Sequence, residues 1–247
     1  MTAAEYLDTV RRLPLGTLQD LTAGFPFAVL SPHPDDETLG TGGLISAACA
    51  AGQRVDVIVI TDGSGSHPRS QAFPRQRLIE LRRTEVEAAG SVLGLAPDQL
   101  HHLGLPDTQA PMSGPAFDAA VAAIIAACTK SGARSLFATW HGDPHCDHQA
   151  TAQMAKAVRQ RIPDIGLWAY PIWGWHLDPL LQLRDSWPRG LRLDISRHQA
   201  SKRAAIFAHA SQTTDLIDDD PQGFRLTEAT LGLFLGPFEY FLKVVDE

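Results

Sequence analysis

Short runs of β-branched and other apolar residues alternate along the chain with stretches of helical length. The apolar runs cover residues 27–30, 55–60, 136–139 and 167–170. The longer stretches between the first three runs cover residues 39–51, 75–93 and 117–129, and a glycine follows each of them closely, as is typical at the end of a helix. Strands that alternate with helices in this way predict βαβ units. We therefore expect an α/β fold, a Rossmann-like three-layer sandwich with a mostly parallel sheet.

The size of the chain favours one domain over residues 1–247. With 247 residues, 44% of them hydrophobic, the chain can bury a sizeable core. No stretch approaches the roughly 18 consecutive apolar residues that a membrane span needs, and the first apolar run is too short for a secretory signal. The three cysteines are far apart and form no CxxC pair, which indicates neither a disulfide framework nor a cysteine zinc site. These features predict a cytoplasmic protein.

The charge balance excludes one class of partner. The chain has 21 basic and 28 acidic residues, a net charge of −7. A nucleic-acid partner is not expected, because phosphate binding needs a basic face. The oligomeric state stays open, and assembly into a homo-oligomer is compatible with the sequence.

An imidazole and three carboxylates stand together directly after the first predicted strand, in the sequence His33-Pro34-Asp35-Asp36-Glu37. Neighbouring carboxylates repel one another, and a bound cation would offset that repulsion and favour their ionised forms. The same acids could instead complement the dipole at the amino terminus of a helix. For each acid taken alone, both interpretations stay open.

A second cluster follows the predicted strand 136–139, in the sequence His141-Gly142-Asp143-Pro144-His145-Cys146-Asp147-His148. His145 and His148 are three residues apart and can face the same side of a helix start, whereas Cys146 is expected to point away. Because α/β sheets bind ligands beyond the carboxyl ends of their strands, the two clusters are expected to meet. Two histidines and a carboxylate, with one position left for water, form a catalytic zinc set.

Together the two clusters resemble the signature of the PIG-L/LmbE-like family of zinc-dependent N-acetylglucosaminyl deacetylases. The similarity extends over most of the chain. The segments 57–63, 83–94, 103–107 and 202–212 resemble, in turn, the family's second strand and loop, its Arg/Glu-containing helix, its substrate loop and its late helix. The resemblance implies a hydrolase that removes an N-acetyl or other N-acyl group from a small sugar-like substrate.

The resemblance also implies roles for individual residues. The implied zinc ligands are His33, Asp36 and His148. Asp35 would be the general base toward a zinc-activated water, and a protonated His145 would assist the oxyanion or the leaving amine. Asp147 would act catalytically by keeping His145 protonated, although it could equally cap a helix.

Asp107 lies in the stretch that resembles the family's substrate loop. The resemblance implies hydrogen bonds from Asp107 to sugar hydroxyls, and a turn after Pro106 is an equal alternative. Arg83 and Glu85, in the segment that resembles the Arg/Glu-containing helix, are expected to form a structural ion pair.

Two features depart from the family pattern where substrate selection is expected. Ser64 stands where many members have Glu, and the Trp-rich stretch 168–187 matches no family pattern. Trp173 and Trp175 could stack on sugar rings, although burial in the core is the commoner fate of tryptophan. The loops 61–74, 105–115 and 171–190 are candidate lids, and the acidic run 218–220 is expected to be a solvated turn.

Other functions fit the sequence less well. Gly40-Thr41-Gly42-Gly43 follows a strand as in dinucleotide-binding oxidoreductases, but the preceding acids would repel a pyrophosphate. A metal-binding family member without hydrolytic activity would have no use for Asp35 and His145 beside the metal. A phosphoesterase usually needs two metals and more ligands. The same ligands also accept Fe²⁺ and Co²⁺, so the sequence does not fix the metal.

Overall fold

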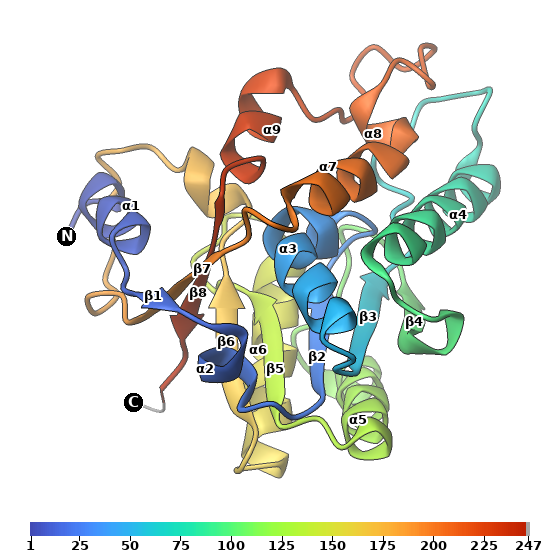
Figure 1. The fold of residues 1–247 in the computed structure, drawn as a ribbon. Helices are drawn as coiled ribbons and strands as arrows, with labels where there is room; N and C mark the ends of the chain where they lie inside the picture. Colours follow the sequence, from blue (N-terminus) through green and yellow to red (C-terminus); the bar gives the residue numbers. More distant parts are fainter. Residues whose placement is uncertain (246–247) are drawn as a thin grey trace.

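The computed structural model describes residues 1–245, within which eight strands form one mostly parallel sheet (Figure 1). The strands are β1 (Leu15–Gly16), β2 (Phe27–Ser31), β3 (Val55–Thr61), β4 (Leu100–Leu105), β5 (Ser135–Thr139), β6 (Gly166–Tyr170), β7 (Gly190–Asp194) and β8 (Phe238–Lys243). Their order across the sheet is β1-β7-β8-β6-β5-β2-β3-β4. Only β8 runs antiparallel to its neighbours. The predicted α/β fold is confirmed.

Helices cover both faces of this sheet (Figure 1). They are α1 (Ala3–Arg11), α2 (Leu18–Thr22), α3 (Asp36–Ala50), α4 (Arg75–Leu93), α5 (Gly114–Ser131), α6 (Cys146–Arg161), α7 (Gln199–Ala208), α8 (Ala210–Thr213) and α9 (Glu228–Phe234), with the 3-10 helices η1 (Pro97–Gln99) and η2 (Trp173–His176). Helices α3, α4 and α7 lie on one face, and α5 and α6 lie on the other. Within residues 1–245, none of these helices is long and apolar enough to cross a membrane.

The continuous apolar runs of the sequence are explained by strands that are buried on both faces. In β2, Phe27 and Val29 belong to the core under α3, α4 and α7, whereas Ala28 and Leu30 belong to the core under α5 and α6. Successive side chains of a strand point to opposite faces, so both sets must be apolar. This pattern is why the four central strands could be predicted from the sequence.

The remaining strands lie toward the edges of the sheet and were not predicted. In β4, all six residues are partly or fully exposed. In β8, the polar Glu239 interrupts the apolar pattern. Strands of this kind lack the apolar run on which the prediction depended.

The order of the central strands positions the site. Strand β2 pairs with β3 on one side and with β5 on the other, all in parallel. The chain therefore leaves β2 in one direction across the sheet and later returns to its other side, which creates a crevice at the carboxyl ends of β2 and β5. The first motif follows β2 and the second follows β5, so both lie at this crevice.

The glycines of α3 serve close packing. A Cβ atom on Gly40 would lie 2.2 Å from Cδ2 of Tyr170, and one on Gly43 would lie 2.5 Å from Cγ2 of Ile195. Both glycines lie inside the helix rather than in a turn before it. The Gly40–Gly43 run therefore allows α3 to approach its neighbours and does not form a dinucleotide-binding turn.

Candidate metal centre and active site

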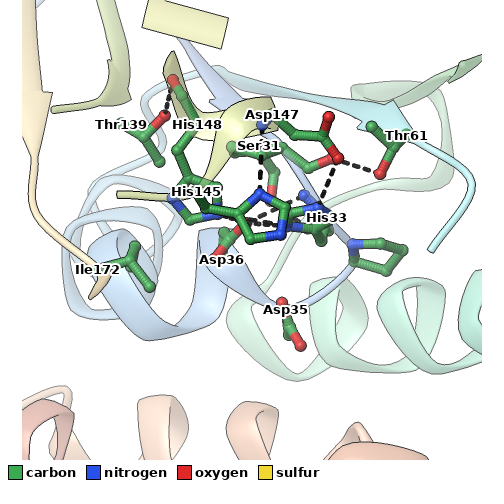
Figure 2. Close-up of polar contacts among 12 residues, drawn as sticks. Ser31, His33, Asp35, Asp36, Thr61, Thr139, His145, Asp147, His148 and Ile172 are labelled. Carbon is green, nitrogen blue, oxygen red and sulfur yellow. Dashed lines mark hydrogen bonds and ion pairs between the residues drawn. The ribbon is translucent and has the colours of Figure 1, made fainter. Parts of the chain in front are cut away.

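Three donor atoms from the two motifs converge at the crevice. His33 Nδ1 lies 3.1 Å from Asp36 Oδ2, which lies 3.2 Å from His148 Nε2. The triangle closes with 3.3 Å between His148 Nε2 and His33 Nδ1. The three side chains come from the loop after β2, the first turn of α3 and the first turn of α6, and Figure 2 shows them pointing toward one another.

This triangle has the size that a tetrahedral zinc ion requires. Ligand atoms at 2.0–2.1 Å from zinc are about 3.3–3.4 Å apart in a tetrahedral site. The observed edges of 3.1, 3.2 and 3.3 Å are close to this value. Two nitrogens and one carboxylate oxygen leave a fourth position for water or substrate. The residues present therefore fit a catalytic zinc ion.

A carboxylate stands behind each of the two histidines of the triangle. His33 Nε2 lies 3.0 Å from Asp147 Oδ2, and His148 Nδ1 lies 3.4 Å from Asp143 Oδ1. Such outer carboxylates orient the rings of metal-binding histidines and raise their basicity. Both carboxylates are themselves fully buried.

Asp143 also fixes the start of η2. Its second oxygen, Oδ2, accepts hydrogen bonds from the backbone amides of Ile172, Trp173 and Gly174 at 2.9, 2.8 and 3.2 Å. One carboxylate thus joins this segment to His148. No role of Asp143 was expected from the sequence, although its place in the histidine cluster was a signal.

The electrostatics of the site indicate a surplus of negative charge. Burial by itself would lower the pKa of His148, but the charges of Asp36 and Asp143 raise it to about 9. Burial opposes charge on His33 as well, yet hydrogen bonds to three surrounding carboxylates raise its pKa well above the ordinary value. The two imidazoles take up protons because the carboxylates around them favour positive charge. A divalent cation would supply that charge in place of the protons.

Asp35 lies beside the triangle in a strained conformation. Its φ angle of 150° is in the region that favours glycine. Burial raises the pKa of its carboxyl to about 6, against the opposing charge of Arg82. Arg82 Nη2 donates to Asp35 Oδ2 at 2.9 Å and to the Pro34 carbonyl at 2.6 Å. A carboxylate with a pKa in this range suits a general base at neutral pH.

The partners of Arg82 correct one prediction. Arg83 and Glu85 do not pair with each other; Arg83 contacts Glu87 on the surface, and Glu85 accepts hydrogen bonds from Ser211. The buried arginine is Arg82, which shares one face of α4 with Glu85. Arg82 and Glu85 stand at the helical spacing that the apolar residues Leu78 and Val86 define, and this spacing was the signal in the sequence for a buried face.

His145 is positioned as a neutral hydrogen-bond donor. Its Nδ1 accepts a hydrogen bond from the Asp147 amide at 3.2 Å, which leaves the proton of the neutral ring on Nε2. Burial lowers the pKa of His145, and the charges of His33 and His148 lower it further. A neutral His145 differs from the protonated form that was expected from the sequence, and its role in the reaction stays a prediction.

The carboxylate of Asp147 contacts groups other than His145. Besides His33, it accepts hydrogen bonds from the amides of Thr108 and Ala110 at 2.7 and 3.0 Å. The charge of Asp147 acts to raise the pKa of His145, so its expected role as a counter-charge stays a prediction. Asp147 also joins the loop after β4 to His33.

Asp107 enters the site from that same loop. Its Oδ1 lies 3.3 Å from His33 Nε2, and its Oδ2 accepts a hydrogen bond from the Gly65 amide at 2.8 Å. The side chain therefore faces the crevice instead of only forming a turn. Contact with a sugar hydroxyl stays a prediction.

The structure places the two tryptophans against the core and Ser64 in a local turn. Trp173 and Trp175 are half-buried against the core, where their rings contact Phe224 at 5.5 Å and Tyr240 at 5.4 Å between centroids. Core packing therefore explains both tryptophans, and stacking on a sugar stays a prediction. Ser64 donates to Asp62 in a local turn.

The acidic run 218–220 is not merely a solvated turn. Asp219 accepts hydrogen bonds from the Ser70 hydroxyl and from the amides of Gln71 and Ala72. Asp220, which is buried, accepts one from the Arg69 amide at 2.9 Å. The run joins the loop 61–74 to the segment after α8 by hydrogen bonds, and the role of this loop as a lid stays a prediction.

A sequence comparison decides the family. The family model described as PIG-L, GlcNAc-PI de-N-acetylase, matches residues 28–159, more than half of the chain. The chain belongs to the PIG-L family. The match includes both motifs and Arg82 but ends before α7 and α8. A comparison with curated proteins gives no match.

Solved structures share the fold of this PIG-L protein. N,N'-diacetylchitobiose deacetylase from Pyrococcus horikoshii has a TM-score of 0.62 and 23% identity, over 87% of this chain and 82% of that one. The zinc inhibited form of teicoplanin deacetylase has a TM-score of 0.64 and 18% identity, over 90% and 98%. GalB, the 4-carboxy-2-hydroxymuconate hydratase from Pseudomonas putida KT2440, has a TM-score of 0.65 and 18% identity, over 90% and 97%. The fold therefore occurs in proteins named for different reactions.

Proposed function

We propose that this chain is a zinc-dependent amide hydrolase that removes the N-acetyl group, or another N-acyl group, from a small sugar-like substrate such as an N-acetylglucosamine derivative. The observation that carries the proposal is the triangle of His33 Nδ1, Asp36 Oδ2 and His148 Nε2. Its edges of 3.1–3.3 Å fit zinc, and a general base and a hydrogen-bond donor lie beside it. His33, Asp36 and His148 would hold the ion. When bound, zinc polarises an amide carbonyl and makes a water molecule more acidic.

The residues around the triangle perform the proton transfers. Asp35, held by Arg82, takes a proton from the attacking water as its oxygen bonds to the amide carbon. The Nε2–H of neutral His145 donates to the carbonyl oxygen as negative charge develops there. As the carbon–nitrogen bond breaks, Asp35 returns the proton to the nitrogen. The products are a carboxylic acid and an amine, and transfer of the second proton of the water from the acid to the amine gives a carboxylate, acetate in the simplest case, and an ammonium ion.

Two further findings support this choice of reaction. The family description names a de-N-acetylase, and two of the solved structures that share the fold are named as deacetylases. The hydratase shares the fold to a similar extent, so the family description is what favours this choice of reaction. Asp107, which faces the crevice, is the proposed contact for a sugar hydroxyl.

The proposed setting is the cytoplasm. Cys49, Cys128 and Cys146 are free thiols, which suits a reducing compartment. The proposed partner is the small acetylated substrate.

Amine release tests the proposal directly. The protein would be loaded with zinc, and its metal content measured, before incubation with N-acetylglucosamine, its N-propionyl analogue and N,N'-diacetylchitobiose. We expect about one zinc per chain and amine release that a chelator abolishes and zinc restores. Release that persists without metal would contradict the zinc dependence, and metal-loaded protein that releases amine from no acylated sugar would contradict the hydrolase assignment.

A further inference from the structure

A buried histidine lies next to the catalytic loop, outside the part of the chain that matches the family model. His209 connects α7 to α8, and its side chain is 1% exposed. Its Nε2 lies 3.3 Å from Oε1 of Glu37, whose side chain is also 1% exposed. Neither ring nitrogen of His209 makes a well-directed hydrogen bond within residues 1–245. Burying such nitrogens costs stability, so the placement of this ring requires an explanation.

Glu37 connects this histidine to the strained backbone of the general base. Its other oxygen, Oε2, accepts hydrogen bonds from the Asp35 amide at 3.1 Å and from the Ser31 hydroxyl at 2.8 Å. The Ser31 hydroxyl also accepts a hydrogen bond from the Glu37 amide. The Glu37 carboxylate therefore fixes the amide of Asp35, where φ is 150°. His209 is the contact of that carboxylate on its opposite side.

A second series of contacts connects Asp35 to the segment around His209 through helix α4. Arg82 donates to the Asp35 carboxylate, and Glu85, three residues later on the same helix, accepts from the Ser211 amide and hydroxyl at 2.7 and 2.6 Å. Ser211 lies in α8, two residues after His209. The two series of contacts form a closed ring. Asp35 contacts Arg82 of α4, and Glu85 of the same helix contacts Ser211 of α8. His209, at the start of α8, contacts Glu37, which accepts from the Asp35 amide.

We propose that His209 and Glu37 are positioning residues that, together with Arg82, hold Asp35 in its strained conformation. Residues in sparsely populated backbone regions persist only where their surroundings fix them. The ring supplies that restraint from two sides: Arg82 holds the carboxylate, and Glu37, supported by His209, holds the amide. The expected effect on kcat rests on the proposed hydrolase function, whereas the proposed restraint of the Asp35 backbone is independent of that function.

Substitution of His209 tests the restraint. In His209→Leu, Glu37 loses its contact with His209, and we expect kcat to fall about 10–100-fold, as for misplacement of a catalytic group by up to about 1 Å. We expect KM and zinc content to remain within about twofold of wild type, because the donor triangle and Asp107 do not contact His209. In His209→Gln, an amide donor can still reach Glu37, and we expect most of kcat to return.

His198→Gln is the matched control. His198 lies at the start of α7, and its Nδ1 lies 3.1 Å from the hydroxyl of Ser46 in α3. Like His209, it contacts α3, but it does not belong to the ring of contacts around Asp35. We expect its kcat to equal that of wild type. A wild-type kcat in folded His209→Leu, or an equal loss in His198→Gln, would overturn the proposal.

Hydrogen exchange provides a readout that needs no substrate. The Asp35 amide is expected to exchange faster in zinc-loaded His209→Leu than in wild type, and to keep its protection in His209→Gln and His198→Gln. Unchanged protection in His209→Leu would overturn the proposal even if amine release fails for every protein. If exchange is faster in His209→Leu than in wild type but the wild-type protein releases no amine, the restraint is established and the hydrolase function alone is refuted.

Discussion

Two buried charged clusters contact helix α3, and they differ in charge balance. At its amino terminus, Asp36 and two histidines are surrounded by further carboxylates, so acids outnumber bases. Near its middle, Lys202 Nζ pairs with Glu239 Oε1 at 2.7 Å, and the same carboxylate accepts the amides of Gly43 and Leu44. The second cluster is neutral, whereas the first has a surplus of negative charge that the proposed zinc ion would balance. Two equally buried clusters thus differ in the roles that we propose for them.

The largest expected effect is the loss of a proposed metal ligand. In His148→Ala, the triangle of donor atoms loses one corner. We expect zinc affinity to fall by more than the 10–100-fold that is typical of an outer partner, and amine release to fall to background. Zinc content after dialysis and amine release together check this outcome. Retention of one zinc per chain would show that the triangle is not the metal site.

Replacement of the proposed general base should leave zinc binding intact and slow the chemical step. In Asp35→Asn, the amide oxygen can still accept from Arg82, but it cannot take a proton. We expect zinc content to remain unchanged and kcat to fall about 10²–10⁴-fold, the usual contribution of a general base. Zinc analysis and single-turnover amine release measure the two quantities. Equal zinc loss in Asp35→Asn and His148→Ala would refute the division of roles.

These two predictions concern residues whose roles the family resemblance implies. His33, Asp35 and Asp36 lie within four consecutive residues and follow a strand with a continuous apolar run, as His145 and His148 do. Strand order then brings the two motifs together, because both follow strands at the topological switch point. The site was predictable where its residues are local and follow buried strands.

The surroundings of the site could not be predicted in the same way. Which arginine reaches Asp35 depends on the rotation of α4 about its axis, and one residue along a helix changes the direction by about 100°. Arg82 rather than Arg83 faces inward for this reason. The support from His209 depends on contact between segments more than 170 residues apart, for which the sequence carries no local signal.

Removal of an outer carboxylate should have an intermediate effect. In Asp143→Asn, the ring of His148 loses its charged partner while an oxygen remains for the amides of Ile172 and Trp173. We expect zinc affinity to fall about 10–100-fold, and turnover to recover at saturating zinc. Competition with a chelator measures the affinity. Asp118→Asn, an exposed carboxylate on α5, is the control and should leave the affinity unchanged; the same affinity in both variants would contradict the role of Asp143.

The smallest effect on activity is expected in the second cluster. In Lys202→Met, the buried carboxylate of Glu239 keeps its backbone donors but loses its only ion-pair partner among residues 1–245. Breaking a buried pair in this way should lower the free energy of unfolding by about 3–5 kcal/mol. Zinc content and kcat of the folded protein should stay within about twofold of wild type, because the pair contacts neither the triangle nor Asp35. Urea unfolding followed by tryptophan fluorescence measures the stability.

A second substitution sharpens the contrast between the two clusters. In Lys202→Met combined with Glu239→Gln, the unpaired charge disappears, and an amide oxygen still accepts from Gly43 and Leu44. We expect the double variant to regain part of the lost stability, because an isolated buried charge costs more than a buried neutral group. A structural pair can thus be neutralised as a unit, whereas His148 and Asp36 cannot be replaced in this way, since in the proposed site each supplies a donor atom to the cation. If Lys202→Met instead lost zinc as His148→Ala does, the distinction between the roles proposed for the two clusters would be wrong.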